Sequence, residues 1–250
     1  MNILILAAGY ATRLYPLTLN KAKPLLEVAG KPMIEWVLDN LAPISDIENV
    51  YVVTNDKFAA DFQLWADEYG QRQPKLQFRI INDNSRDDTD KLGAIGDINL
   101  VVSRESLTRS DLVVVAGDNL FSQPLEGFAE FARGRQAVLA TYDVQDLEAI
   151  KKYNAIETNE DGVITHFEEK PAQPRSTRTG IALYYFSKET VSLFPTYIAA
   201  GNNPDQPGRF IQWLYTRVPV HTYDVPGIWF DIGSKETLEE ANTIFANLGK

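Results

Sequence analysis

Short runs of mainly apolar residues alternate, in the first half of the chain, with stretches whose apolar residues recur every three or four positions. Such runs, bounded by polar or glycine-containing segments, are typical of buried strands in a parallel sheet. The predicted strands are residues 3–7, 50–54, 76–81 and 112–116. The stretches between them have the spacing of amphipathic helices. The predicted helices are residues 31–41, 57–69 and 92–102. This alternation predicts an α/β protein with a doubly wound, mostly parallel sheet.

The pattern changes after about residue 142, where turn residues separate shorter strands. Residues 159–162 read Asn-Glu-Asp-Gly between two strand-like segments, which predicts a β-hairpin. A further strand is predicted at residues 180–186, and helices at residues 210–215 and 235–248. We therefore expect a small mixed β insertion on the parallel sheet.

The overall charge argues against nucleic acid or a membrane as a partner. The chain has 34 acidic and 24 basic residues, a formal net charge of -10, which opposes binding to polyanionic surfaces. It has no cysteine, so a disulfide framework, a thiolate nucleophile and a Cys-type zinc site are excluded. No apolar run approaches the roughly 20 residues that a membrane span needs, and the first residues form no basic leader. We expect a cytoplasmic protein.

A basic segment with small residues follows the first predicted strand. Ala8 and Gly9 leave room for backbone N–H groups to approach an anion closely. Four cations follow within nineteen residues, at Arg13, Lys21, Lys23 and Lys31. Because the chain is otherwise acidic, they form a candidate phosphate site. The spacing alone leaves a solvated basic loop as an equal alternative.

A carboxylate follows the fourth predicted strand, in the sequence Gly117-Asp118-Asn119. Open α/β sheets bind their ligands at the carboxyl ends of their strands, so Asp118 is a candidate site residue. An aspartate in this position also suits a turn or a helix cap. Position alone leaves both interpretations open.

Longer motifs distinguish between these interpretations. Residues 6–36 resemble the signature of the sugar-1-phosphate nucleotidyltransferases, which reads G-x-G-T-R-L-x-P-L-T, then K-P-L-L, then G-K-P-M-I. The matching residues are Gly9, Thr12, Arg13, Leu14, Pro16, Leu17, Thr18, Lys23, Pro24, Leu25, Leu26, Gly30, Lys31, Pro32, Met33 and Ile34. The similarity continues in the family's order at Leu92-Gly93-Ala94, Gly117-Asp118-Asn119, Glu168-Glu169-Lys170-Pro171, Thr179-Gly180 and Trp229-Phe230-Asp231-Ile232-Gly233. The resemblance, which extends to glucose-1-phosphate thymidylyltransferases and other nucleotide-sugar pyrophosphorylases, spans nearly the whole chain.

The resemblance implies a fold, a domain organisation and a reaction. The fold is a Rossmann-like nucleotidyltransferase domain over residues 1–250, with its β insertion over the sugar site. Residues 1–142 would form the nucleotide-binding half, and residues 143–250 the sugar-binding half with the C-terminal helix. The reaction joins a nucleoside triphosphate to a sugar 1-phosphate by in-line attack at the α-phosphate, giving a nucleotide sugar and pyrophosphate.

The resemblance also assigns roles to individual residues. Arg13 would hold the β- and γ-phosphates and Lys23 the α-phosphate, while Asp118 and Asp231 would bind Mg²⁺ and act with both cations in catalysis. The implied nucleotide-binding residues are Ala8, Gly9, Thr12, Arg13, Leu92 and Gly93. The implied sugar-phosphate-binding residues are Tyr153, Asn154, Glu169, Lys170 and Gly180. Lys170 would grip the phosphate, Glu169 would accept from sugar hydroxyls, and the backbone at Gly180 would approach the sugar because no Cβ intervenes.

Three departures from the family pattern limit what carries over. Ala11 replaces the second loop glycine, and we expect it to keep the tight turn only with a negative φ. Residues 22–25 read Ala-Lys-Pro-Leu where thymidylyltransferases commonly read S-K-Q-L. In the sugar pocket, residues 207–214 replace the usual segment, and Asn154 follows Tyr153 where a glycine is frequent. The base, the sugar, the pathway and the oligomeric state therefore stay open, although relatives are often dimers or tetramers. Two alternatives remain: a catalytically silent nucleotide-sugar-binding relative, and a metal-dependent glycosyltransferase, which would usually need D-x-D at residues 117–119.

Overall fold

The computed structural model describes residues 1–44 and 46–248. They form two compact units, and each unit is assembled from separate stretches of the chain. Unit 1 comprises Met1–Leu92, Val115–Glu126 and Pro226–Lys250, and unit 2 comprises Gly93–Val114 and Gly127–Val225. These units differ from the expected halves 1–142 and 143–250, because the last 25 residues belong to unit 1 and unit 2 begins at Gly93.

Unit 1 contains a parallel sheet with strand order β1-β4-β5. These strands are β1 (Asn2–Leu6), β4 (Asn49–Thr54) and β5 (Gln77–Asn82). Each lies within two residues of a predicted strand. Except for its first residue, β4 is buried along its length, as expected for a strand covered on both faces.

Three long helices belong to unit 1: α1 (Met33–Leu41), α2 (Ala59–Arg72) and α9 (Lys235–Leu248). Helix α1 begins directly after Pro32, whose missing N–H costs nothing at a helix start. Its predicted apolar face at Ile34, Val37, Leu38 and Leu41 is buried. The periodicity thus identified both the helix and the face that packs into the core.

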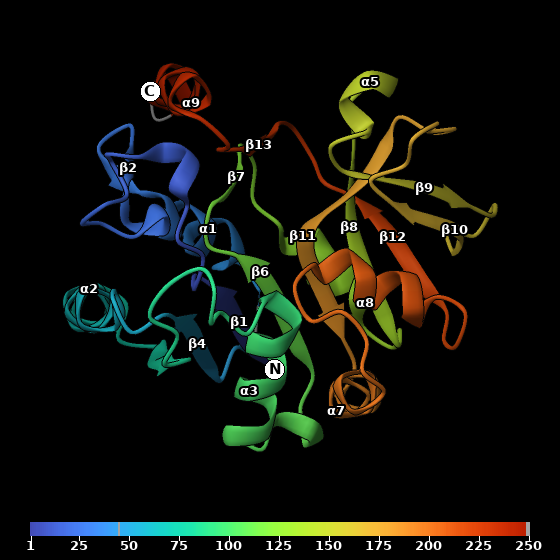
Figure 1. Cartoon of the computed structure of the whole chain (residues 1–250), viewed down its shortest axis with the longest axis horizontal. Coiled ribbons are helices and arrows are strands. Elements are labelled where there is room, and N and C mark those ends of the chain that lie inside the picture. The colour runs from blue at the N-terminus through green and yellow to red at the C-terminus, as the bar shows by residue number, and fades with distance from the viewer. Residues whose placement is uncertain (45, 249–250) are drawn as a thin grey trace. The chain divides into compact units, whose positions relative to one another are not determined.

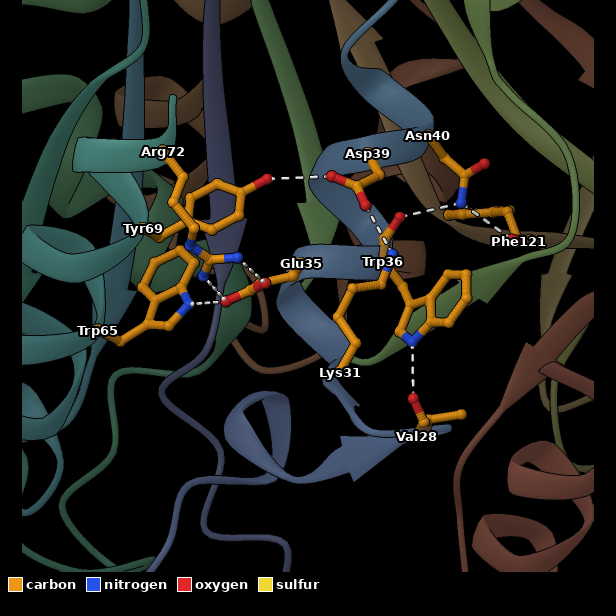
Figure 2. A network of polar contacts seen from close by, with 10 residues as sticks. All are labelled: Val28, Lys31, Glu35, Trp36, Asp39, Asn40, Trp65, Tyr69, Arg72 and Phe121. Atoms are coloured by element: carbon orange, nitrogen blue, oxygen red, sulfur yellow. Dashed lines mark hydrogen bonds and ion pairs between the residues drawn. The ribbon is translucent and has the colours of Figure 1, made fainter. Parts of the chain in front are cut away.

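A polar network joins α1 to α2 within unit 1 (Figure 2). Glu35 is only 4% exposed, yet its carboxylate accepts hydrogen bonds from Trp65 Nε1 at 3.1 Å and from both terminal nitrogens of Arg72 at 2.7 and 3.1 Å. One turn later, Asp39 accepts from the hydroxyl of Tyr69 at 3.1 Å. These bonds supply the partners that a buried carboxylate requires.

Unit 2 is built around strand β8 (Ala137–Asp143), which pairs antiparallel with β11 (Arg178–Phe186) and parallel with β12 (Val220–Asp224). Strand β6 (Leu112–Ala116) follows β11 in the strand order, and its last two residues belong to unit 1. The predicted hairpin forms a separate small sheet of β9 (Asn154–Thr158) and β10 (Ile164–Glu169) (Figure 1). The predicted mixed β insertion is therefore present.

Helices cover the strands of unit 2. Helix α3 (Ala94–Arg104) packs against α7 (Phe194–Ala199) and α8 (Pro207–Leu214), and α8 also packs against β10. The shorter helices are η3 (Leu107–Arg109), α4 (Glu126–Ala132, whose first residue is in unit 1), α5 (Leu147–Ile150) and α6 (Lys188–Val191). Pairing in the main sheet is mostly parallel, the small two-stranded sheets are antiparallel, and helices flank the strands, which confirms the α/β class. None of the described helices has the length and apolar character to cross a membrane.

Candidate functional site

The 3₁₀-helix η2 (Lys23–Leu25) brings a cation to the carboxyl end of β6. Gly117 makes this possible, because a Cβ there would lie 3.1 Å from atoms of Ile5 and Pro24. Its N–H donates to the carbonyl of Leu6 at 3.0 Å, which fixes the turn beside β1. Lys23 Nζ consequently donates to Asp118 Oδ2 at 2.5 Å, in a pair whose side chains are only 13% and 27% exposed.

A second carboxylate reaches the same place through strand register. Strands β7 (Asn119–Phe121) and β13 (Trp229–Asp231) pair antiparallel, and Asp231 stands opposite Asn119, the neighbour of Asp118. Burial raises the pKa of Asp231, and the negative charge of Asp118 raises it further, while Lys23 and Arg13 lower it. The two carboxylates therefore repel one another at close range, with two cations beside them.

A cavity of about 270 Å³ opens at this cluster, entirely within unit 1. Its lining residues are Ala11, Thr12, Arg13, Leu14, Lys23, Asp231, Ile232 and Gly233. Leu14 and Ile232 are buried in one apolar cluster with residues of α9, which holds the 3₁₀-helix η1 (Thr12–Leu14) next to β13. The structure thus brings together Arg13, Lys23, Asp118 and Asp231, the four residues predicted to be catalytic.

The loop before η1 leaves room for an anion to approach its backbone. No atom lies within 4 Å of the position that a Cβ on Gly9 would take. The side-chain amide of buried Asn55 donates to the carbonyl of Ala8 at 2.9 Å and holds the loop in place. The negative φ expected for Ala11 is wrong: its φ is +47°. Thr18 Oγ1 donates to the Ala11 carbonyl at 2.8 Å, so this left-handed turn is held by a side chain.

Only part of the predicted four-cation site exists. Lys31 Nζ donates to Asp39 Oδ2 at 2.6 Å and lies 3.4 Å from the centre of the Trp36 ring (Figure 2). The inclusion of Lys31 among the phosphate-binding cations is therefore wrong, because its ammonium is held against α1. Lys21 is exposed and does not line the cavity. The local positive charge comes from Lys23 and Arg13, and Arg13 makes no ion pair with any described residue.

Leu92 and Gly93 lie at the junction of the two units. Leu92 is 37% exposed. Gly93 has a φ of +78°, and a Cβ there would lie 2.6 Å from Asp205 Cα and 2.7 Å from the carbonyl oxygen of Pro204. The N–H groups of Ala94 and Ile95 donate to the Asp205 and Pro204 carbonyls at 3.1 and 2.7 Å. Glycine is thus required here by the protein's own packing.

A buried carboxylate and an exposed cation stand side by side at the end of β10, in unit 2. Glu169 Oε2 is sealed from solvent and has no hydrogen-bond partner among the described residues. Burial raises the pKa of Glu169, which the charges of Lys170 and Arg209 partly offset. Lys170 is exposed, and its backbone N–H donates to the carbonyl of Tyr153 at 2.8 Å. The exposed ammonium of Lys170 next to the partly buried carboxylate of Glu169 suits a ligand that carries phosphate and hydroxyl groups.

Asn154 and Gly180 bind one another rather than facing open space. Asn154 Oδ1 accepts from the N–H of Gly180 at 2.7 Å, and its Nδ2 donates to the Gly180 carbonyl at 3.1 Å. A Cβ on Gly180 would lie 2.6 Å from Leu139 Cδ2 and 3.1 Å from Ile156 Cδ1. The expected reason for Gly180, room for a sugar, is wrong, since protein atoms fill that room. Asn154 locks the start of β9 to β11.

These features agree with the comparisons with known proteins. The family model described as "Nucleotidyl transferase" matches residues 2–247. The chain belongs to the nucleotidyl transferase family. Among curated relatives, the chain is 24% identical to the bifunctional protein GlmU of Methanocaldococcus jannaschii, over 97% of this chain and 53% of the relative. It is 29% identical to a putative mannose-1-phosphate guanyltransferase of Sulfolobus acidocaldarius, over 93% of this chain and 60% of the relative.

Solved structures show the same fold. A putative glucose-1-phosphate thymidylyltransferase from Bacillus anthracis superposes on this chain with a TM-score of 0.84 at 22% identity, covering 99% of this chain and 96% of that one. A UDP-glucose pyrophosphorylase complexed with UDP-glucose gives 0.80 at 20% identity, covering 98% of each. The chain spans only about half to two thirds of the length of the curated relatives it matches.

Leu14, Ile232 and Gly233 also line the cavity, although the motif match assigned them no role in the site. Leu14 and Ile232 form part of its apolar wall, and at Gly233 no atom lies within 4 Å of a Cβ position. Gly233 and Ile232 belong to the matched motif around Asp231, so the motif contained the signal. What it lacked was the register between β13 and β7, which places that motif beside Asp118.

Proposed function

We propose that this protein joins a nucleoside triphosphate to a sugar 1-phosphate and releases pyrophosphate. One observation carries the proposal: Arg13, Lys23 and Asp231 line one cavity, and Asp118, at the carboxyl end of β6, is paired with Lys23. Two cations suit the phosphates of a nucleotide, and two carboxylates suit a divalent metal. The family membership and the names of the relatives support the same reaction.

In the proposed reaction, a phosphate oxygen of the sugar 1-phosphate forms a bond to the α-phosphorus of the triphosphate. The bond between that phosphorus and the β-bridging oxygen breaks, and the electron pair leaves with pyrophosphate. Arg13, exposed and without an ion pair among the described residues, stabilises the charge that develops on the leaving group. Lys23 binds the α-phosphate. No general base is needed, because the attacking phosphate oxygen is already ionised.

Asp118 and Asp231 are the residues that would hold a divalent cation, and we propose Mg²⁺. Burial and the charge of Asp118 both raise the pKa of Asp231, and a cation held by the two carboxylates would relieve this. Within residues 1–44 and 46–248 no group of three or more His, Cys, Asp or Glu side chains is arranged around a common metal position. Two carboxylates still fit Mg²⁺, which usually keeps several waters and takes one or two protein carboxylates. Bound there, the ion neutralises phosphate charge.

Unit 2 supplies the proposed sugar-phosphate site. Lys170 offers an exposed ammonium for the phosphate, and we assign the carboxylate of the adjacent Glu169 to the sugar hydroxyls. Asn154 acts as a positioning residue, because both ends of its amide are bound to Gly180. The base and the sugar are left unspecified in this proposal.

The test is pyrophosphate release from a panel of nucleoside triphosphates and sugar 1-phosphates, with and without Mg²⁺. We expect turnover only when both substrates and the metal are present. Asp118→Asn should lower kcat/KM by a factor on the order of a hundred or more, because it removes a metal ligand and the partner of Lys23.

Asp67→Asn is the matched control. Asp67 is an exposed aspartate of α2 whose carboxylate accepts only from Gln63 in the described structure, so activity should stay within about twofold of wild type. Near-normal activity of Asp118→Asn would remove that residue from the mechanism. Nucleotide binding without turnover on any substrate pair would favour the catalytically silent alternative.

A further inference from the structure

A larger cavity, of about 420 Å³, lies in unit 2 and shares no residue with the cavity at Arg13. Its lining residues are Tyr197 of α7, Asn202 and Asn203 of the following loop, and Arg209, Gln212 and Trp213 of α8. The volume is within the range of small-molecule sites, roughly 300–1,000 Å³.

Its polar groups are one guanidinium and three side-chain amides, of which Asn202 already donates its amide nitrogen to the Tyr197 carbonyl at 2.9 Å. Arg209 forms no ion pair with any residue that the structure describes, and its guanidinium only donates weakly to Gln212 Oε1 at 3.4 Å. Asn203 Oδ1 accepts from the N–H of Asp205 at 2.8 Å, which leaves the Asn203 amide nitrogen directed elsewhere. In a chain of formal charge -10, an unpaired guanidinium with amide donors beside it favours an anionic group.

The opposite wall is aromatic. Tyr197 and Trp213 meet edge to face, with ring centres 5.5 Å apart. The Tyr197 hydroxyl is already used, because it donates to the Asn203 carbonyl at 2.8 Å. Arg217 covers part of the Trp213 ring at 4.0 Å. A ligand with an apolar ring face and hydroxyl groups, such as a sugar, would pack against this wall while its anion met Arg209.

Two segments that line the cavity also contact residues that were predicted to bind the substrates. The loop that carries Asn203 continues into Pro204 and Asp205, whose carbonyls accept from the first N–H groups of α3, directly after Gly93. On α8, Gly208 precedes Arg209, and a Cβ on Gly208 would lie 2.1 Å from Glu169 Oε2. A ligand in the cavity therefore touches the loop and the helix turn that position Gly93 and Glu169.

We propose that this cavity is a second ligand site, for a sugar or sugar acid that carries a phosphate or carboxylate group, and that its occupant adjusts sugar-phosphate binding. Arg209 binds the anion, Asn203 and Gln212 bind hydroxyl groups, and Trp213 packs on the ring. The regulatory part rests on the proposed transferase activity, whereas the binding part does not.

Binding is tested by calorimetry and tryptophan fluorescence, with glucose 6-phosphate, gluconate and inorganic phosphate as probes and glucose as the neutral control. We expect glucose 6-phosphate or gluconate to bind, glucose to bind at least tenfold more weakly, and Arg209→Gln to weaken anion binding at least tenfold. Arg217→Gln is the matched control. Arg217 is exposed and lies over the Trp213 ring, but it does not line the cavity. The variant should bind as wild type does.

Two further results distinguish this site from the substrate site. Lys170→Ala should leave binding of the probes intact, and binding that is lost in Lys170→Ala but kept in Arg209→Gln would overturn the proposal. Absence of binding by all three anions would overturn it as well. With an active substrate pair, the probe should change the KM for the sugar phosphate at least twofold in wild type and not in Arg209→Gln. Binding without that change would overturn the regulatory role alone.

Discussion

Ala11 has a φ of +47°, a conformation that costs a residue with a Cβ about 1–2 kcal/mol. Ala11→Gly removes this strain, but it also removes a methyl group that packs partly against the core around Leu14. That burial is incomplete and contributes less than about 0.8 kcal/mol. We therefore expect Ala11→Gly to raise the free energy of unfolding by about 0.5–1 kcal/mol, measured by urea denaturation.

Ala60→Gly provides the control of opposite sign. Ala60 is exposed in α2 and has helical geometry, so glycine there should lower stability by up to about 1 kcal/mol. If Ala11→Gly is destabilised as Ala60→Gly is, the left-handed turn is not strained, and the family's usual glycine at this position has another cause.

Asp231 gives a pH-dependent prediction, because burial and Asp118 raise its pKa in the folded state. The folded protein then binds more protons than the unfolded chain between the two pKa values, so stability falls as pH rises through this window. At a pH above the folded-state pKa, the folded protein is destabilised by the full cost of keeping Asp231 ionised. Asp231→Asn removes this penalty and should be more stable than wild type at pH 7, and we expect it to be inactive.

The measurement is the urea midpoint of both proteins from pH 7 to pH 4. The advantage of Asp231→Asn should shrink as pH falls toward the unfolded-state pKa of about 3.9. Adding Mg²⁺ at pH 7 should stabilise wild type and not the variant, because a ligand stabilises only the state that binds it. A variant less stable than wild type at pH 7 would show that Lys23 and Arg13 outweigh the burial of Asp231.

At the scale of elements, the contact between α1 and α2 depends on a buried carboxylate. Arg72→Met leaves Glu35, 4% exposed, with Trp65 as its remaining hydrogen-bond donor among the described residues. A buried charged group that loses its partner costs about 1–3 kcal/mol. We expect Arg72→Met to lower the free energy of unfolding by that amount, and Glu35→Gln in the same chain to restore part of it.

The control for this prediction is Arg104→Met. Arg104 is 54% exposed, and its Nε is 3.8 Å from Glu105 Oε1, so its removal should change stability by less than about 0.5 kcal/mol. Equal effects of the two substitutions would mean that Glu35 gains nothing from Arg72 beyond an ordinary surface ion pair.

Elements with periodic apolar faces were predictable from the sequence. Helix α9 was predicted with its observed bounds, and β6 likewise, because their spacing or apolar run fits a single structure. Strand β8 was not predicted. Its residues Ala-Val-Leu-Ala-Thr-Tyr-Asp contain no turn residue, and their apolar and polar positions do not alternate in a way that distinguishes a strand from a helix. The site depended on motifs, and the proximity of Asp231 to Asp118 depends on β-register that no local pattern contains.

For the molecule as a whole, the chain crosses between the two units four times, at residues 92–93, 114–115, 126–127 and 225–226. The change in the pattern of apolar and turn residues near residue 142 therefore does not coincide with a boundary between the units. Residue 142 lies inside β8, whose partners β11 and β12 come later in the chain. Long-range pairing of this kind decides which segments fold together, and local patterns do not report it.

The two units also make the proposed substrate sites separable by experiment. If unit 1 binds the nucleotide and unit 2 the sugar phosphate, each substrate should slow amide hydrogen exchange in a different set of segments. A triphosphate with Mg²⁺ should protect residues 9–14 and 117–121. A sugar 1-phosphate, added alone, should protect residues 153–156, 168–171 and 179–182. Arg13→Ala should abolish the first pattern and Lys170→Ala the second, each leaving the other unchanged. Protection of the same segments by both substrates would contradict the assignment of Lys170 and Glu169 to the sugar phosphate.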